Sequence, residues 1–310
     1  MTGMPGTSWS GPRPPLDEEE KEVGNQLRAH ILELAGELGE RNVWRKSAME
    51  KAAAYIENAF GEAGYAVRSQ PFQSQGVMVR NLAAELPASS GGEEIVLLGA
   101  HYDTVVDSPG ANDNASGIAA LLEIARLLRD RKPSRSIRFV AFANEEAPFF
   151  YSMEMGSHLY ARRAREQGEK LIAMISLETV GYYSDAPGSQ RFPNPLYSWF
   201  YPDTGNFIAF VGNLRSRKLV RRSIGSFRRH TAFPSEGVAA PGGLEGIHWS
   251  DHWSFWEEGY PALMVTDTAP FRYPHYHLES DTPEKIDYER LARVVRGLSR
   301  VALDLAEDGS

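Results

Sequence analysis

Short apolar runs of strand length alternate along this chain with longer segments whose apolar residues recur at helical spacing. Strands are predicted at Ile95–Ala100, Ile137–Ala143 and Ile172–Leu177, with helices between them at Ser116–Asp130 and Glu154–Gly168. This alternation is typical of a parallel or mixed sheet that is covered on both faces. We therefore predict the α/β fold class, with a mixed, mostly parallel, twisted sheet and helices flanking both faces.

The same pattern extends to both ends of the chain. The other expected elements are helices at Asp17–Gly39 and Arg45–Gly61, strands at Phe207–Val211 and Ala262–Thr266, and a last helix at Asp287–Leu305. No internal repeat and no linker separates two cores. Residues 17–310 are therefore predicted to form a single domain after a disordered lead-in at residues 1–16.

Two stretches, 181–205 and 233–256, are too long and too irregular to be simple connections. The first is rich in aromatic residues, and the second has Pro241, Gly242 and Gly243 at its middle. Long ordered loops on an α/β scaffold tend to build the rim of a binding site, so aromatic side chains are predicted to line a pocket there. The alternative is that these loops only cover the edges of the sheet.

The net charge of −8 argues against nucleic-acid binding, because phosphate-binding proteins usually carry a basic domain or patch. One basic stretch does occur, at residues 214–230, where arginines alternate with apolar residues at helical spacing. This spacing predicts an amphipathic helix whose charged face is solvated. A docking surface for an acidic partner is the alternative.

Cysteine is absent from all 310 residues, which excludes disulfides, thiolate nucleophiles and cysteine-bound zinc. Any metal must therefore be held by histidine and carboxylate side chains. No apolar run approaches the roughly 20 residues of a membrane-spanning helix, and the N-terminus lacks the basic start and apolar stretch of a signal peptide. We expect a cytoplasmic protein that neither enters a membrane nor binds nucleic acid.

Acidic and imidazole side chains gather after the carboxyl ends of the predicted strands, where open α/β sheets bind their ligands. His101 and Asp103 follow the first strand, Glu145 and Glu146 the second, and Glu178 the third. Neighbouring buried carboxylates repel each other unless a cation or a shared proton relieves the repulsion. A divalent metal gives that relief, so Glu146 is predicted to bind it while Glu145 acts as the general base of a hydrolase.

The remaining candidates are ambiguous on local sequence alone. Asp103 could accept the ring N–H of the histidine two residues before it and fix the tautomer. Asp113 lies in a turn-rich loop before a helix, where an N-cap role is the alternative to metal binding. His277, with a carboxylate four residues later, suits a metal ligand, and His275 is its rival. Asp251 either supports the metal ligands from behind or caps a loop, and we interpret it as a loop cap.

Five short motifs follow one another from about residue 95 to the end of the chain: His101-Tyr102-Asp103, Asn112 to Gly117, Asn144-Glu145-Glu146, Ser250-Asp251-His252 and His277 to Thr282. Their order and spacing resemble those of the M28 zinc aminopeptidases. The resemblance implies a two-zinc site bridged by Asp113. His101 and Glu178 would complete one metal, and Glu146 and His277 the other. It also implies Glu145 as general base, Asp103 as the residue that orients His101, and Tyr276 as a donor to the developing oxyanion.

The activity implied is hydrolysis of the N-terminal peptide bond of peptides with a free amino end, using two Zn²⁺ per chain or other divalent transition metals. The chain departs from the family pattern at Glu178, where aspartate is usual, so one metal could be held differently. The aromatic loops predict a preference for apolar N-terminal side chains. Two alternatives stay open, a single-zinc acyltransferase like the glutaminyl cyclases and a non-catalytic binding protein on the same fold.

Overall fold

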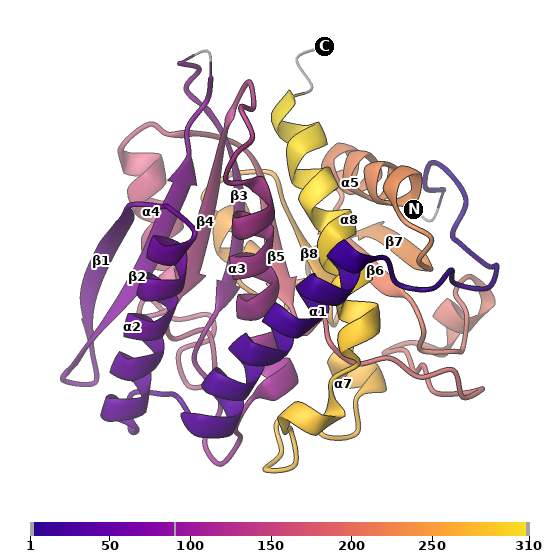
Figure 1. Ribbon diagram of the computed structural model, residues 1–310, viewed down its shortest axis with the longest axis horizontal. Helices are drawn as coiled ribbons and strands as arrows, with labels where there is room; N and C mark the ends of the chain where they lie inside the picture. The colour runs from indigo at the N-terminus through magenta and orange to yellow at the C-terminus, as the bar shows by residue number, and fades with distance from the viewer. Residues whose placement is uncertain (1–2, 90, 308–310) are drawn as a thin grey trace.

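The computed structural model describes residues 3–89 and 91–307, which form one eight-stranded sheet with helices around it (Figure 1). The strands are β1 (Val67–Ser74), β2 (Val77–Leu86), β3 (Glu94–His101), β4 (Ser136–Phe142), β5 (Lys170–Glu178), β6 (Ile208–Asn213), β7 (Ser235–Ala240) and β8 (Ala262–Thr266). Their order is β1-β2-β4-β3-β5-β8-β6-β7. The central strands β4, β3, β5 and β8 are parallel, whereas β1 and β2, β2 and β4, and β6 and β8 pair antiparallel. The predicted fold class is confirmed.

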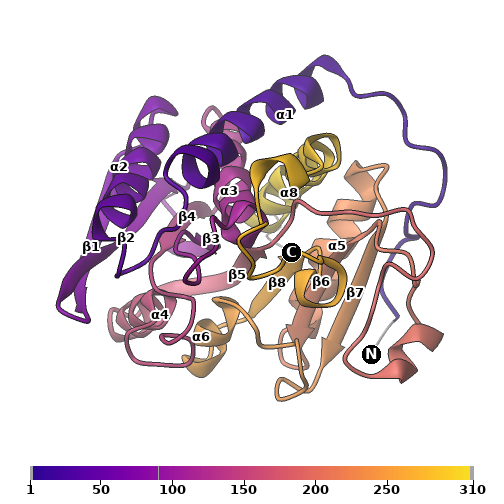
Figure 2. The ribbon, with the colours of Figure 1, turned by 90° about the horizontal axis from the view of Figure 1, so that it is seen from below.

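Helices cover both faces of the sheet (Figure 2). One face carries α1 (Glu18–Ile31) and its continuation η1 (Leu32–Glu37), α2 (Lys46–Glu62), α3 (Gly117–Leu128), α5 (Arg217–His230) and α8 (Tyr288–Glu307). The other face carries α4 (Gly156–Glu166) and α6 (His252–Glu257). Four short helical turns complete the chain: η2 (Ala111–Ser116), η3 (Pro195–Trp199), α7 (Ala269–Arg272) and η4 (Pro283–Lys285). None of the described helices is both long and apolar enough to cross a bilayer.

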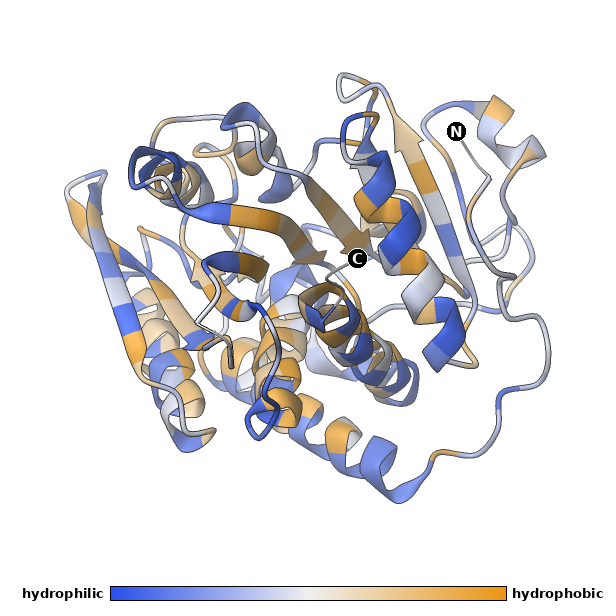
Figure 3. Cartoon of the chain, turned by 90° about the horizontal axis from the view of Figure 1, so that it is seen from above, coloured by the Kyte–Doolittle hydropathy of each residue, from blue (hydrophilic) through white to orange (hydrophobic). Residues whose placement is uncertain are grey.

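The central strands are apolar along their length because helices bury both faces of the sheet. Every residue of β4 is buried, as is every residue of β3 after the first. The flanking helices turn their apolar sides toward the strands, as the hydropathy colouring in Figure 3 shows. A rigid, fully packed platform therefore carries the loops that follow the carboxyl ends of β3, β4 and β5.

Local sequence signals fix several helices as predicted. Asp17 caps α1, because its Oδ1 accepts the backbone N–H of Glu20 at 2.8 Å while the Glu20 side chain accepts the backbone N–H of Asp17 at 3.1 Å. The basic stretch forms α5, whose apolar residues such as Ile224 and Phe227 are fully buried. The predicted amphipathic helix is confirmed.

Three strands lie outside the predicted set, namely β1, β2 and β7. β1 reads VRSQPFQS, and its polar residues and Pro71 suit an edge strand that is paired on one side only. β7 is the opposite edge and lies inside 233–256. The expectation that this stretch is irregular throughout is therefore wrong, since it also contains the start of α6.

The described part of the N-terminal lead-in contacts the domain without forming a helix or strand. Arg228 of α5 donates to the carbonyl oxygens of Pro5 and Gly6, both at 3.1 Å, and Ser8 Oγ accepts the backbone N–H of Ser235 at 2.9 Å. Part of the lead-in predicted to be disordered thus lies against α5 and the edge strand β7, which offer it donors and acceptors. Residues 1–2 lie outside the described part of the chain.

Candidate metal centre

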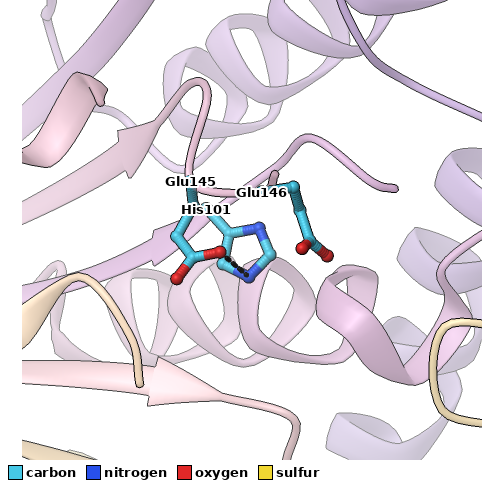
Figure 4. A group of neighbouring side chains, drawn as sticks. All are labelled: His101, Glu145 and Glu146. Carbon is cyan, nitrogen blue, oxygen red and sulfur yellow. Dashed lines mark ion pairs between the residues drawn. The ribbon is translucent and has the colours of Figure 1, made fainter. Parts of the chain in front are cut away.

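Three neighbouring strands deliver the first four side chains of the site. His101 is the last residue of β3 and Glu178 the last of β5, while Glu145 and Glu146 lie in the turn after β4, separated by two residues from its end at Phe142. β3 pairs in parallel with both other strands, so their carboxyl ends meet at one edge of the sheet. Figure 4 shows His101 between the carboxylates of Glu145 and Glu146.

Asp113 reaches the same place from the loop before α3. The backbone N–H groups of Asn112 and Asp113 donate to the two carboxylate oxygens of Asp281, at 2.8 and 3.1 Å. Asn114 joins this loop to the end of β5, since its Nδ2 donates to the Leu177 carbonyl at 2.8 Å. The loop is therefore held from two sides, and Asp113 serves no helix cap.

The two oxygens of Asp113 face different histidines. Its Oδ1 lies 3.4 Å from His101 Nε2, and its Oδ2 lies 3.0 Å from His277 Nε2. His101 Nε2 also lies 3.3 Å from a Glu178 oxygen, and His277 Nε2 lies 3.4 Å from Glu146 Oε1. The five predicted ligands thus form two groups, each able to hold a metal ion, that share one carboxylate.

The electrostatics of the site suit divalent cations. Asp113 Oδ1 and Glu146 Oε1 are buried and have no hydrogen-bond partner among the described residues. Burial raises the pKa of Glu146 to about 7, and burial raises the pKa of Glu145 well above its ordinary value. Carboxylates that are this costly to ionise are stabilised by positive charge, and imidazole nitrogens with carboxylate oxygens are donors that zinc accepts.

Asp103 contacts the site in a way that the sequence did not reveal. Its carboxylate oxygens accept the backbone N–H groups of Glu145 and Glu146, both at 3.0 Å. His101 Nδ1 is 3.6 Å from the Asp103 carboxylate but 3.2 Å from the Asp103 carbonyl oxygen. Asp103 therefore holds the Glu145-Glu146 backbone with its side chain and faces the imidazole with both its carboxylate and its carbonyl.

Tyr276 and His277 stack on each other with ring centroids 3.8 Å apart. The His277 side chain is 36% exposed, so this ligand position lies at the mouth of the site. Burial raises the pKa of the Tyr276 hydroxyl well above 10, which keeps it protonated and able to donate a hydrogen bond. The rival His275 instead contacts Ser280 Oγ at 2.8 Å and belongs to neither group.

The interpretation of Asp251 as a loop cap is wrong. Its side chain makes no capping hydrogen bond to α6, and both of its carboxylate oxygens are buried without a hydrogen-bond partner among the described residues. Burial raises the pKa of Asp251 to about 7. The neighbouring Ser250 hydroxyl donates to Glu178 Oε2 at 2.8 Å. The Ser250-Asp251-His252 motif therefore helps to hold a proposed metal ligand in place.

Two other supporting residues, Arg41 and Asp267, gave little or no signal in the sequence. Arg41, fully buried, donates to the carbonyls of Tyr102 and Gly110 on the chain that leads from His101 to Asp113. Asp267 follows β8 and accepts the Asn112 side-chain amide at 2.9 Å. The position of Asp267 after a strand was its only signal, whereas nothing near Arg41 distinguished it from a surface arginine.

An apolar cavity of about 120 Å³ opens beside the metal centre, with Glu178 and Tyr276 on its border. The loop 181–205 contributes Phe192, Tyr197 and Tyr201, and the stretch 233–256 contributes Trp249 among others. Both loops therefore line a pocket, as predicted, rather than only covering the edges of the sheet.

Comparison with known proteins gives a family and a fold. Residues 81–302 match the sequence pattern of Peptidase family M28. The uncharacterized protein YfbL of Escherichia coli K12 is 40% identical over 258 residues, which cover 81% of this chain and 78% of that protein. The aminopeptidase YwaD of Bacillus subtilis is 27% identical over 271 residues, which cover 86% of this chain and only half of that protein.

Solved structures share the fold at lower identity. BSAP, a zinc aminopeptidase from Bacillus subtilis, superposes with a TM-score of 0.74 at 17% identity, over 92% of this chain and 95% of that one. The glutaminyl cyclase of Fimbriiglobus ruber superposes with a TM-score of 0.65 at 20% identity, over 95% of this chain and 97% of that one.

Proposed function

Because the chain belongs to peptidase family M28, we propose that it is a two-zinc aminopeptidase that removes residues from the amino ends of peptides. The observation that carries the proposal is the pair of histidine and carboxylate groups that share Asp113. His101 and Glu178 would complete the ligands of one ion, and Glu146 and His277 those of the other. Bound zinc supplies a Lewis acid for the scissile carbonyl and lowers the pKa of water toward neutrality.

Glu145 is proposed as the general base. It belongs to neither of the two groups that share Asp113, although it forms a third possible group with His101 and Glu146, and its carboxylate lies 3.9 Å from His101 Nε2, close enough to the centre to exchange a proton there. It would take a proton from the attacking water and pass it to the leaving amine. Tyr276 would donate its hydroxyl proton in a hydrogen bond to the oxyanion that develops on the carbonyl.

The acidic surroundings would also favour substrates with a free amino end. Glu178 borders both the metal centre and the apolar cavity, so it can pair with the α-ammonium or α-amino group of a substrate. The side chain of the N-terminal residue would then enter the cavity, and the peptide would leave through the mouth beside His277. A blocked N-terminus would lose this contact.

A glutaminyl cyclase shares the fold, and the number of bound zinc ions separates the two activities. We expect elemental analysis of the purified protein to give two zinc ions per chain, and hydrolysis of aminoacyl anilides to stop on chelation and return with zinc. One zinc ion per chain, with cyclisation of N-terminal glutamine, would instead identify a cyclase.

The role of Glu145 has its own test. The Glu145→Gln variant is expected to keep its zinc but to lose about 100- to 10,000-fold in kcat, because only the proton acceptor is removed. The exposed Glu62 of α2 offers a matched control, since Glu62→Gln makes the same chemical change away from the site. Unchanged hydrolysis by Glu145→Gln would overturn the assigned mechanism.

A further inference from the structure

The floor of the apolar cavity is a row of four side chains across four neighbouring strands. Glu178 of β5 pairs with Thr266 of β8, Thr266 pairs with Ala209 of β6, and Ala209 pairs with Glu236 of β7. Directly paired residues project on the same face of a sheet, and all four line the cavity. Two carboxylates thus stand at opposite ends of one floor, with only small side chains between them.

The spacing of the strands sets the separation of these two glutamates. Three inter-strand steps of about 4.8 Å place their Cα atoms about 14 Å apart. Both glutamates line the cavity between them, so the gap suits a residue whose amino group lies at Glu178 and whose side chain extends toward Glu236. A long, straight side chain fits this gap better than a short or branched one.

The walls above this floor are aromatic. Tyr201 donates to the Gly237 carbonyl of β7 at 3.0 Å and packs with Phe192 and Tyr197, while Trp249 and Phe271 stack with ring centroids 6.0 Å apart. Aromatic faces accept apolar methylene groups, and they also attract ammonium and guanidinium groups through their ring electrons. The walls therefore suit a long aliphatic stem that ends in a cation.

Glu236 lacks a countercharge on the cavity side. It forms no ion pair with any residue in the described part of the chain, and it is partly buried. The cavity lining contains no lysine, arginine or histidine among the described residues, and Arg228, whose charge acts on Glu236, donates its hydrogen bonds to the Ser235 carbonyl and hydroxyl and to the lead-in backbone. Burial raises the pKa of Glu236, while Arg228 and a hydrogen bond from Ser8 act in the opposite direction.

We propose that Glu236 makes this pocket selective for N-terminal lysine and arginine, an inference that rests on the proposed aminopeptidase activity. The cationic end of the side chain would pair with the Glu236 carboxylate, and its methylene groups would lie over Thr266 and Ala209 between the aromatic walls. The preference for apolar N-terminal side chains that was predicted from the aromatic loops considers the aromatic walls alone. It takes no account of the Glu236 carboxylate.

The test compares kcat/KM of the zinc-loaded protein for lysyl, arginyl, leucyl and phenylalanyl anilides. We expect the lysyl and arginyl compounds to be preferred, and Glu236→Gln to lower their kcat/KM by about 10- to 100-fold while that for leucine changes little. Retained leucyl hydrolysis shows that the variant is folded. Glu62→Gln serves again as the matched control and is expected to keep the wild-type preference.

Binding of free arginine and leucine, measured by calorimetry on the same proteins, separates failure of this inference from failure of the proposed function. If no anilide is hydrolysed, the aminopeptidase proposal fails, yet weaker binding of arginine to Glu236→Gln still supports the pocket. A wild-type preference for leucine or phenylalanine, or equal losses for all substrates and ligands in Glu236→Gln, would overturn the selectivity.

Discussion

Asp103 follows β3, yet its two carboxylate oxygens accept the backbone N–H groups of Glu145 and Glu146, which follow β4. A carboxylate can accept two such bonds at once because both of its oxygens are acceptors. The pair fixes the direction in which the two glutamates leave the strand. One of these side chains is the proposed base and the other a proposed ligand, so Asp103 acts on both by way of their backbone.

The Asp103→Asn variant tests this role, because it replaces one carboxylate oxygen by an NH₂ group. The amide keeps the shape, but its NH₂ group would face a backbone N–H, leaving one donor unpaired in a buried site. We expect zinc affinity to fall about 10- to 100-fold, as for other groups that orient metal ligands. Competition with a fluorescent chelator measures it. Asp107→Asn, exposed in the same loop, is the control, and equal affinities in both variants would contradict the role.

The sequence predicted those residues whose chemistry restricts their type and place. His101, Glu146 and Glu178 could be assigned because histidine and carboxylates stand where strands end. Asp251 was misinterpreted because a short Ser-Asp-His run looks the same whether it lies on a surface turn or under a buried site. Asp251 is buried because residues far away in the chain pack against it. A local sequence pattern contains no information about those residues.

At the scale of secondary-structure elements, Arg41 connects the segment after η1 to the loop between β3 and η2 through hydrogen bonds. Its guanidinium donates to five carbonyl oxygens, those of Leu34, Gly39, Tyr102, Pro109 and Gly110. Burial lowers its pKa to about 10, so it stays charged at neutral pH. A single side chain therefore holds the path between two proposed ligands, His101 and Asp113.

Replacement of Arg41 by methionine keeps an unbranched apolar stem but leaves these carbonyls without their donor. We expect the free energy of unfolding to fall by about 3–5 kcal/mol, as when one partner of a buried charged network is removed. Arg45→Met is the control, because Arg45 is exposed and makes one ion pair, with Glu40, worth at most about 1 kcal/mol. Urea unfolding of both variants measures the loss of unfolding free energy. Equal losses in the Arg41 and Arg45 variants would contradict the structural role given to Arg41.

Strands could be predicted from the sequence where both of their faces are buried, because continuous apolar runs such as β4 have few other interpretations. The edge strands β1 and β7 were not predicted from the sequence, because they are paired on one side only. In β7, a six-residue strand with a glycine and a glutamate, the same Glu236 that obscured the strand now lies in the proposed pocket. Residues that serve a site weaken the pattern that would reveal their element.

At the scale of the whole molecule, segments from most of the fold meet at the candidate metal centre. Its five proposed ligands come from the ends of β3 and β5, the turn after β4, the loop before α3 and the loop after α7, so they span residues 101 to 277. Unfolding separates these segments and destroys both groups. Metal bound there therefore stabilises the entire fold rather than one loop, since the unfolded chain offers no comparable site.

Zinc held at 100 times its dissociation constant is expected to add about 2.7 kcal/mol per site to the free energy of unfolding. For a domain of this size that corresponds to a rise in the unfolding temperature of about 4 °C for each occupied site, or about 8 °C for two. Scanning calorimetry in zinc buffer and in chelator measures the rise. Glu145→Gln should keep most of this rise, because Glu145 is not one of the five proposed ligands, whereas Asp113→Asn should lose most of it, because both groups that hold the proposed ligands use that carboxylate. The same rise in Asp113→Asn would mean that zinc stabilises the protein elsewhere, and the shared-carboxylate centre would then have to be abandoned.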